Sequence, residues 1–232
     1  METSALHYIR RLDFFPELTE DEKAELAAHS RMLRCLRGHP IHISGGSDDA
    51  FWLIKEGQVR LSILGAGGKK ITVALLGPGE IIGEMAVAGL EGYAEVAEAL
   101  TGCVLCQVPT EYFRRIVNRR PDLSLHITKL VGLRRRQIAN RIQDVLFLTV
   151  PQRVARLLLR LADEFPGTTV SGRRYVNLKL THQEMADLVG SNREAVTVAL
   201  RRLDRLDYAK PVKRFWVLVD EDALRREADL SE

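Results

Sequence analysis

Two short helical segments around one glycine constrain this chain more than any other feature. The stretch Thr181–Leu206 reads THQEMADLVGSNREAVTVALRRLDRL, which predicts two helices joined by a turn at Val189–Ser191. Gly190 suits that turn, because glycine adopts positive φ without a steric penalty. A Ser or Thr followed three residues later by Glu, the pattern of a capping box, predicts helix starts at Thr181 and at Ser191.

The second of these helices is expected to have one apolar and one polar face. Apolar residues recur at helical spacing along one side, and the other side is mostly charged. This is the layout of a helix-turn-helix whose second helix enters the major groove of DNA; a surface hairpin with solvated charges is the alternative. The apolar side is Ala195, Val196, Ala199, Leu200 and Leu203, and the other side is Arg193, Glu194, Thr197, Val198, Arg201 and Arg205.

Length and composition predict a globular protein of one or two domains, since the 232 residues are 46% hydrophobic and 28% charged. The longest apolar runs are too short to span a bilayer, and the first residues lack the pattern of a secretory signal. We therefore expect a cytoplasmic protein with no membrane partner. The three cysteines argue against a disulfide framework.

Charge is distributed unevenly, although the net charge of +3 is too small to indicate nucleic-acid binding by itself. Between Tyr112 and Gln143 there are nine Lys or Arg and one acid, Asp122. From Ile71 to Phe113 there are six Glu and no Lys or Arg. The second of these stretches therefore has no cation of its own with which to bind an anion.

The first part of the chain changes from a helical pattern to a period of two. Thr19 and Glu22 form a capping box before a predicted helix over Glu20–Ser30. Short segments divided by Gly-rich turns follow, which favours a small antiparallel barrel or jelly roll. The expected strands are Met32–Leu36, Ile41–Ile43, Ala50–Ile54, Gln58–Leu64, Lys70–Leu76 and two within Ala94–Val108.

A helical pattern runs from Pro109 to Phe147, and Pro121 can occupy the first turn of a long helix. An apolar stripe on such a helix needs a partner, either the chain's own barrel or the same helix of a second subunit. We favour a homodimer, because a helix-turn-helix gains affinity from two half-sites. The stripe is Ile127, Leu130 or Val131, Ile138, Ile142 and Val145.

Pro151 is expected to mark the start of a second domain, so the predicted divisions are residues 1–120, 121–150 and 151–232. A hairpin after the second helix would form a wing, whose tip residues Lys210, Lys213 and Arg214 would face phosphates. The predicted fold class is α+β, with a barrel, a long dimerisation helix and a winged helix-turn-helix. The further predicted elements are a helix over Gln152–Phe165, a turn at Pro166-Gly167, a strand over Tyr175–Leu180 and hairpin strands over Tyr208–Val212 and Phe215–Val219.

Three stretches together resemble the bacterial transcription regulators named after the cyclic-AMP receptor protein and the oxygen regulator FNR, the Crp/Fnr family. They are GPGEIIGEMAV at Gly77–Val87, the long helix from Pro121 ending in VLFLTVPQRVARLLLRLA, and THQEMADLVGSNREAV at Thr181–Val196. They occur in the family's order and cover nearly the whole chain. The resemblance implies a sequence-specific regulator that binds a pseudo-palindromic double-stranded DNA site, with RNA polymerase as a further partner if it activates transcription.

By that resemblance, Arg193 and Glu194 occupy the family's base-reading positions. Arginine forks onto guanine O6 and N7, and glutamate accepts from cytosine N4. Glu194 is free for bases if Asn192, rather than Ser191, caps the helix. Val198 replaces an arginine of the cyclic-AMP branch, so it would touch a thymine methyl instead. The candidate DNA-binding residues are Thr181, Gln183, Ser191, Asn192, Arg193, Glu194, Thr197, Val198, Arg201 and Lys213.

A second set of candidate residues follows from the family's cyclic-nucleotide binders, in which a Gly-Glu pair is followed by an Arg-Ser that holds the cyclic phosphate and ribose. Tyr93-Ala94 stands near the place of that Arg-Ser, and Ile138-Ala139 replaces the adenine-contacting Thr-Ser of the long helix. A buried phosphate without a paired charge is costly to desolvate, so we expect no cyclic AMP in the family's usual mode. The candidate ligand-binding residues are Gly83, Glu84, Tyr93, Ala94 and Ile138.

Other cofactors and an enzymatic role each need residues that can be looked for in the sequence. An FNR-type iron–sulfur cluster needs N-terminal cysteines, but the first cysteine is Cys35. Cys103 and Cys106 lie in an expected strand with their thiols on different faces, which favours buried small side chains over a metal site. Haem needs only an apolar pocket and one ligand, so a haem- or redox-linked sensor on the same scaffold is the alternative function. No catalytic residue and no metal site are predicted.

Overall fold

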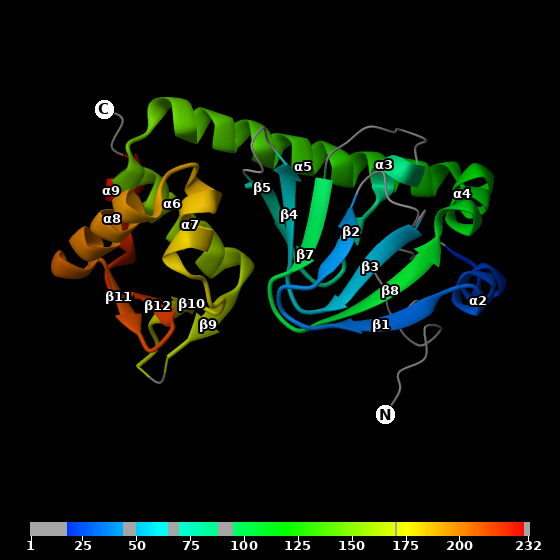
Figure 1. The fold of residues 1–232 in the computed structure, drawn as a ribbon, viewed down its shortest axis with the longest axis horizontal. Helices are drawn as coiled ribbons and strands as arrows, with labels where there is room; N and C mark the ends of the chain where they lie inside the picture. Colours follow the sequence, from blue (N-terminus) through cyan, green and yellow to red (C-terminus); the bar gives the residue numbers. More distant parts are fainter. Residues whose placement is uncertain (1–17, 44–49, 65–69, 88–94, 170, 230–232) are drawn as a thin grey trace. The chain divides into compact units, whose positions relative to one another are not determined.

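The computed structural model describes residues 18–43, 50–64, 70–87, 95–169 and 171–229 (Figure 1). The chain divides into two compact units, Met1–Gln137 and Ile138–Glu232. The division falls inside helix α5 (Pro121–Phe147), so both units include part of this helix. Within the described ranges, no helix is long and apolar enough to cross a membrane.

Two four-stranded antiparallel sheets make up the described β-structure of the first unit, which confirms the jelly-roll prediction. Their strand orders are β1-β8-β3-β6 and β2-β7-β4-β5. The short strand β6 and the single-turn helix α3 (Glu84–Val87) were not predicted, because elements of this length give no periodic signal. The strands are β1 (Arg31–Cys35), β2 (Pro40–Ile43), β3 (Ala50–Glu56), β4 (Val59–Leu64), β5 (Lys70–Leu76), β6 (Ile81–Ile82), β7 (Glu95–Ala99) and β8 (Cys103–Pro109).

Helices α2 (Glu20–Ala28) and α4 (Thr110–Arg119) contribute to the core of this unit. All residues of β3 from Ala50 to Ile54 are buried, so this strand does not alternate between core and solvent. Phe51 of β3 stacks on Phe113 of α4 with a ring-centroid distance of 4.0 Å. Leu26 of α2 belongs to the same cluster and is fully buried. The helices therefore cover a sheet that is apolar on both faces.

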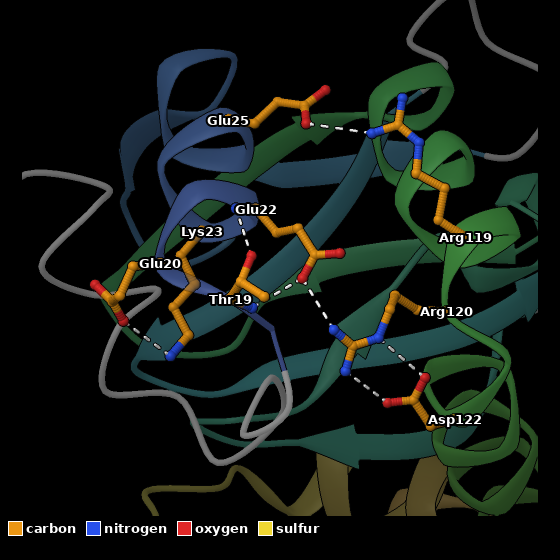
Figure 2. Close-up of polar contacts among 8 residues, drawn as sticks. All are labelled: Thr19, Glu20, Glu22, Lys23, Glu25, Arg119, Arg120 and Asp122. Carbon is orange, nitrogen blue, oxygen red and sulfur yellow. Dashed lines mark hydrogen bonds and ion pairs between the residues drawn. The ribbon is translucent and has the colours of Figure 1, made fainter.

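Figure 2 shows how α2 is attached to the junction between α4 and α5. The Arg120 guanidinium donates to Glu22 Oε2 at 3.0 Å and to Asp122 Oδ2 at 3.0 Å. The same Glu22 oxygen accepts from the Thr19 amide at 2.8 Å, which completes the predicted capping box. One arginine thus joins the start of α2 to the first turn of α5, and Pro121 begins the long helix as expected.

The predicted apolar stripe of α5 divides into two parts. Ile127 and Leu130 pack against the core of the first unit, and Leu123 is buried there. Val131 and Ile142 are instead exposed. Docking on the chain's own barrel therefore accounts for Ile127 and Leu130, whereas the neighbouring Val131 keeps an exposed apolar surface.

The second unit is a winged helix-turn-helix, as predicted. Its sheet has the order β11-β12-β10-β9, so the hairpin that follows α8 pairs with an earlier strand. The helical hairpin α7–α8 packs on α6. The elements are α6 (Val150–Glu164), β9 (Pro166–Thr168), β10 (Arg174–Val176), α7 (His182–Val189), α8 (Arg193–Arg205), β11 (Ala209–Val212), β12 (Phe215–Leu218) and α9 (Glu221–Asp229).

Several predicted details of this unit are wrong. The turn expected at Pro166-Gly167 is strand β9, which pairs with β10, and β10 ends at Val176 rather than continuing to Leu180. Helix α6 begins before Pro151, which lies in its first turn, where a missing N–H costs nothing. Helix α9 was missed, although Leu224 is fully buried and α9 packs against α6.

Candidate nucleic-acid interface

The turn between α7 and α8 depends on one glycine in the left-handed region. Helix α7 begins with the predicted capping box, in which Thr181 Oγ1 accepts from the Glu184 amide at 3.1 Å. It ends at Gly190, with φ 63° and ψ 50°. A side chain at this position would also be crowded, because its Cβ would lie 3.0 Å from Val145 Cγ2. Val189 still belongs to α7, so the turn starts one residue later than predicted.

The cap of α8 is Asn192, so the predicted capping box between Ser191 and Glu194 is wrong. Asn192 Oδ1 accepts from the Ala195 amide at 2.8 Å. Ser191 instead completes the end of α7, because its amide donates to Ala186 O at 3.0 Å, which delays the start of α8 by one residue. The Glu194 carboxylate is exposed and makes no hydrogen bond or ion pair with any described residue. It is therefore free to accept from a ligand.

Helix α8 buries the expected apolar face and exposes the opposite one. Val196, Ala199, Leu200 and Leu203 are buried, and Ala195 is half-buried. On the outward face, the guanidinium groups have no ion pair within the described part of the chain, and Val198 is 63% exposed. The exposed outward residues are Arg193, Glu194, Val198, Arg201 and Arg205.

Thr197 is less accessible than predicted, because its hydroxyl is engaged by protein groups. Thr197 Oγ1 donates to Arg193 O at 2.8 Å, and His182 Nδ1 lies 2.9 Å from the same oxygen. Burial, followed by the positive charges of Arg193 and Arg201, lowers the pKa of His182. Sequence reasoning missed His182, because only the packing of α7 on α8 brings it to the outward face.

The remaining candidate residues lie at the start of α7 and on the wing. Gln183 is exposed, and its Nε2 donates to Asp187 Oδ1 at 2.8 Å. Lys213 is exposed between β11 and β12 with φ 58°, an uncommon conformation for a non-glycine residue. Lys210 was wrongly placed at the tip: it lies in β11, with its Nζ 2.6 Å from Asp207 Oδ1. Of the three predicted tip residues, Lys213 and Arg214 therefore remain at the tip of the wing.

Two arginines outside the helical hairpin hold the end of α7. Arg153 of α6 donates to Val189 O at 2.6 Å and to Gly190 O at 3.2 Å. Arg141, from the last part of α5, donates to Leu188 O. Burial, with a further contribution from the charge of Arg160, lowers the pKa of Arg141 to about 10. Cations at the C-terminal end of a helix complement its dipole, so both arginines stabilise the turn that precedes α8.

The candidate sensor residues are only partly brought together. Gly83 has φ 87°, and a Cβ there would lie 2.6 Å from Ala50 O, so glycine is required. Glu84 is 7% exposed, and its Oε1 lies 2.7 Å from Arg134 Nη1. Arg134 also donates to Ile81 O at 2.8 Å. Tyr93 and Ala94 lie outside the described residues, and Ile138 is half-buried in the second unit.

The ion pair of Glu84 corrects the view that this region has no cation. The count over Ile71–Phe113 was right, but Arg134 reaches the site from α5. Cys103 and Cys106 are both buried, and burial raises the pKa of Cys106 to about 11. A thiol in that state is a poor metal ligand and a poor nucleophile.

Comparison with known proteins places both units in one family. The family model of the cyclic nucleotide-binding domain matches residues 33–120, and that of the Crp-like helix-turn-helix domain matches residues 152–227. The CRP-like cAMP-activated global transcriptional regulator of Mycobacterium tuberculosis is 28% identical over 210 residues, which cover 89% of this chain and 93% of that protein.

Two proteins of Thermus thermophilus agree with this assignment. The Cyclic AMP receptor protein is 30% identical over 167 residues, covering 72% of this chain and 74% of its own length. The crystal structure of a CRP-family transcriptional regulator has a TM-score of 0.72 and 27% identity, covering 84% of this chain and 96% of the other. The chain described here therefore belongs to the Crp/Fnr family, whose members are DNA-binding transcription regulators and not enzymes.

Proposed function

We propose that the protein acts as a homodimer that binds a pseudo-palindromic DNA site, with α8 of each subunit in a major groove. The observation that carries this proposal is the outward face of α8. Arg193, Glu194 and Arg201 are exposed there, and no described residue pairs with their side chains. Free donors and acceptors on one helix face suit direct contact with base edges. Lys213 at the wing tip suits a phosphate contact, which fixes register without reading sequence.

A second copy of the chain is the partner proposed for the exposed side of α5. Val131, Ile142 and Leu146 lie on one side of this helix and are 36%, 56% and 69% exposed. A parallel pair of helices buries such a stripe. The pairing would also present two reading helices with two-fold symmetry, which matches the symmetry of a palindromic site.

We also propose that DNA binding does not depend on cyclic AMP held in the family's usual mode, although two relatives are named for that ligand. The reason is that the expected place of the Arg-Ser falls near Tyr93-Ala94, in a stretch from Ile71 to Phe113 that contains no Lys or Arg. The arginine that does reach Glu84 is already engaged by that carboxylate and by Ile81 O. A cyclic phosphate entering this region would therefore have to displace an existing ion pair.

Selection from random-sequence duplexes tests the proposal. Purified protein is incubated with the duplex library with and without cyclic AMP, and sedimentation measures its oligomeric state. We expect a palindromic motif to be enriched without the nucleotide by a dimer. We also expect its affinity to fall steeply between about 50 and 200 mM salt, because phosphate contacts release counterions.

Each part of the proposal has its own contrary result. Enrichment that appears only with cyclic AMP contradicts the effector proposal and leaves DNA binding intact. Enrichment of a single half-site by a monomer contradicts the dimer. An absence of enrichment, with or without the nucleotide, contradicts sequence-specific binding by α8.

A further inference from the structure

We propose that His182 makes DNA binding proton-linked, so that each subunit takes up a proton on the imidazole when it docks on the duplex. The inference rests on the proposed DNA-binding function and adds a residue and a regulatory variable to it. His182 is the first residue of α7, and in a helix-turn-helix this helix crosses the DNA backbone. The anion that it would contact is a backbone phosphate.

The hydrogen bonds of Thr197 determine which ring nitrogen of His182 carries the proton. A hydroxyl has one hydrogen, and Thr197 donates it to Arg193 O at 2.8 Å. Toward His182 Nδ1, 2.9 Å away, the same oxygen can only accept. Nδ1 is therefore the protonated nitrogen of the neutral ring, and Nε2 carries a lone pair.

This tautomer is a poor ligand for a phosphate. An Nε2 lone pair repels an anionic oxygen and cannot donate to it. Switching the tautomer would break the bond to Thr197, whereas adding a proton keeps that bond and supplies an Nε2–H donor. Proton uptake is thus the way for His182 to bind a phosphate while α7 and α8 stay joined.

Burial, followed by the positive charges of Arg193 and Arg201 on α8, lowers the pKa of His182 and so favours the neutral imidazole in the free protein. Bound DNA acts in the opposite direction, because a phosphate near the ring favours the imidazolium. The same bound DNA offsets the two arginine charges, which removes part of the repulsion.

The other elements packed around His182 do not reverse this balance. On its own helix, Glu184 is engaged in the capping box and Asp187 accepts from a glutamine side chain. Helix α6 also packs on α7, but its Arg153 binds Val189 O at the opposite end of that helix. The charges that act on the ring are therefore mainly the two arginines of α8.

The sign of the linkage follows from the two pKa values. The pKa of His182 is lower in the free protein than in the complex, so binding consumes protons. Affinity then rises as the pH falls through the pKa of the complex, and it levels off below the pKa of the free protein. For one proton per subunit, we expect the dimer to bind at least about tenfold more tightly at pH 5.5 than at pH 7.5.

The test measures the dissociation constant of the full-length protein by fluorescence anisotropy across this pH range at constant salt. The probe is the duplex that the wild-type protein enriches from a random library at pH 7.5. His182→Gln keeps a donor and cannot titrate, so its affinity should lose most of the pH dependence. His39→Gln, at an exposed histidine in the first unit, should retain it.

Thr197→Val and calorimetry provide the second measurement. Valine keeps the shape but removes the acceptor, so the neutral ring is free to switch tautomer and the pH dependence should shrink. Calorimetry of the wild type in two buffers of different ionisation enthalpy should show proton uptake that His182→Gln lacks. Equal pH dependence and equal proton uptake in the wild type and His182→Gln would overturn the inference while leaving DNA binding established. If the wild type enriches no duplex, the proposed function fails and this inference fails with it.

Discussion

The outward face of α8 and the surroundings of Glu84 differ in how far their polar groups are already satisfied. On α8, the side chains of Arg193, Glu194 and Arg201 have no partner in the described ranges. In the first unit, Glu84 is buried and paired with Arg134. The first region has donors and acceptors available for a ligand, and the second would have to give up an ion pair to bind one.

This difference separates the two regions as candidate ligand-binding surfaces. Charged side chains that remain hydrated at the surface need no partner within the protein, so leaving them unpaired costs little folding stability. A buried carboxylate–guanidinium pair is costly to separate. A ligand that binds there must therefore itself form favourable contacts with both the carboxylate and the guanidinium.

Breaking the buried pair should have the largest effect. Glu84→Leu leaves the Arg134 guanidinium without its carboxylate, so we expect the free energy of unfolding of the first unit to fall by about 3–5 kcal/mol. Urea titration followed by Trp52 fluorescence, in a Trp216→Phe background, measures this change. The double variant Glu84→Leu/Arg134→Leu should recover most of the loss. A single variant that loses less than about 1 kcal/mol would show that the pair is solvated and the contrast is false.

On the open surface, a substitution should change binding and leave folding intact. Arg193→Ala should weaken specific DNA binding by about 1–3 kcal/mol and relax the preference at one base pair. Selection from random duplexes and a urea titration measure the two properties. Arg205→Ala, near the other end of α8, is the matched control and should weaken binding without altering the selected motif. An unchanged motif for Arg193→Ala would remove its base-reading role.

The turn that precedes α8 can be tested by substituting Gly190. Gly190→Ala should lower the free energy of unfolding of the second unit by about 1–2 kcal/mol, because alanine is strained in the left-handed region. Trp216 fluorescence, in a Trp52→Phe background, follows this transition. Gly172→Ala is the control: it has φ 79°, and apart from the adjoining residues no described atom lies within 4 Å of the added Cβ. The Gly190 variant should lose more than this control, since it also meets Val145, and equal losses would mean that Val145 moves freely.

The smallest effect should distinguish the two residues that precede α8. Asn192→Ala removes the cap and should lower the free energy of unfolding by about 1 kcal/mol. Ser191→Ala removes a side chain that does not cap this helix, so we expect a change within about 0.5 kcal/mol. Thermal unfolding of both variants compares them. The reverse order of losses would restore the predicted capping box of Ser191 with Glu194.

Features set by neighbouring residues were predicted well from the sequence. The capping boxes at Thr19 and Thr181, the left-handed Gly190 and the hairpin after α8 each depend on a short stretch of chain. The choice between Ser191 and Asn192 could not be made, because both are good caps and only the geometry of the preceding helix end decides between them.

Features that join distant residues were not predictable from one sequence. Arg134 is 50 residues from Glu84, and nothing in the composition of either segment indicates the pair. His182 reaches Thr197 across 15 residues through the packing of two helices. Arg141 and Arg153 reach the end of α7 from other helices, and a basic residue gives no signal of the carbonyl that it will meet.

The cap supplied by Arg141 bears on where this protein can be cut into autonomous fragments. A fragment starting at residue 152, where the helix-turn-helix family model begins, would keep Arg153 but lose the donor to Leu188 O. It would also lose Asp144, which pairs with Arg156 at 2.7 Å. A fragment starting at residue 138 keeps both contacts. The smallest stably folded DNA-binding fragment should therefore include the last turns of α5 as an N-terminal extension.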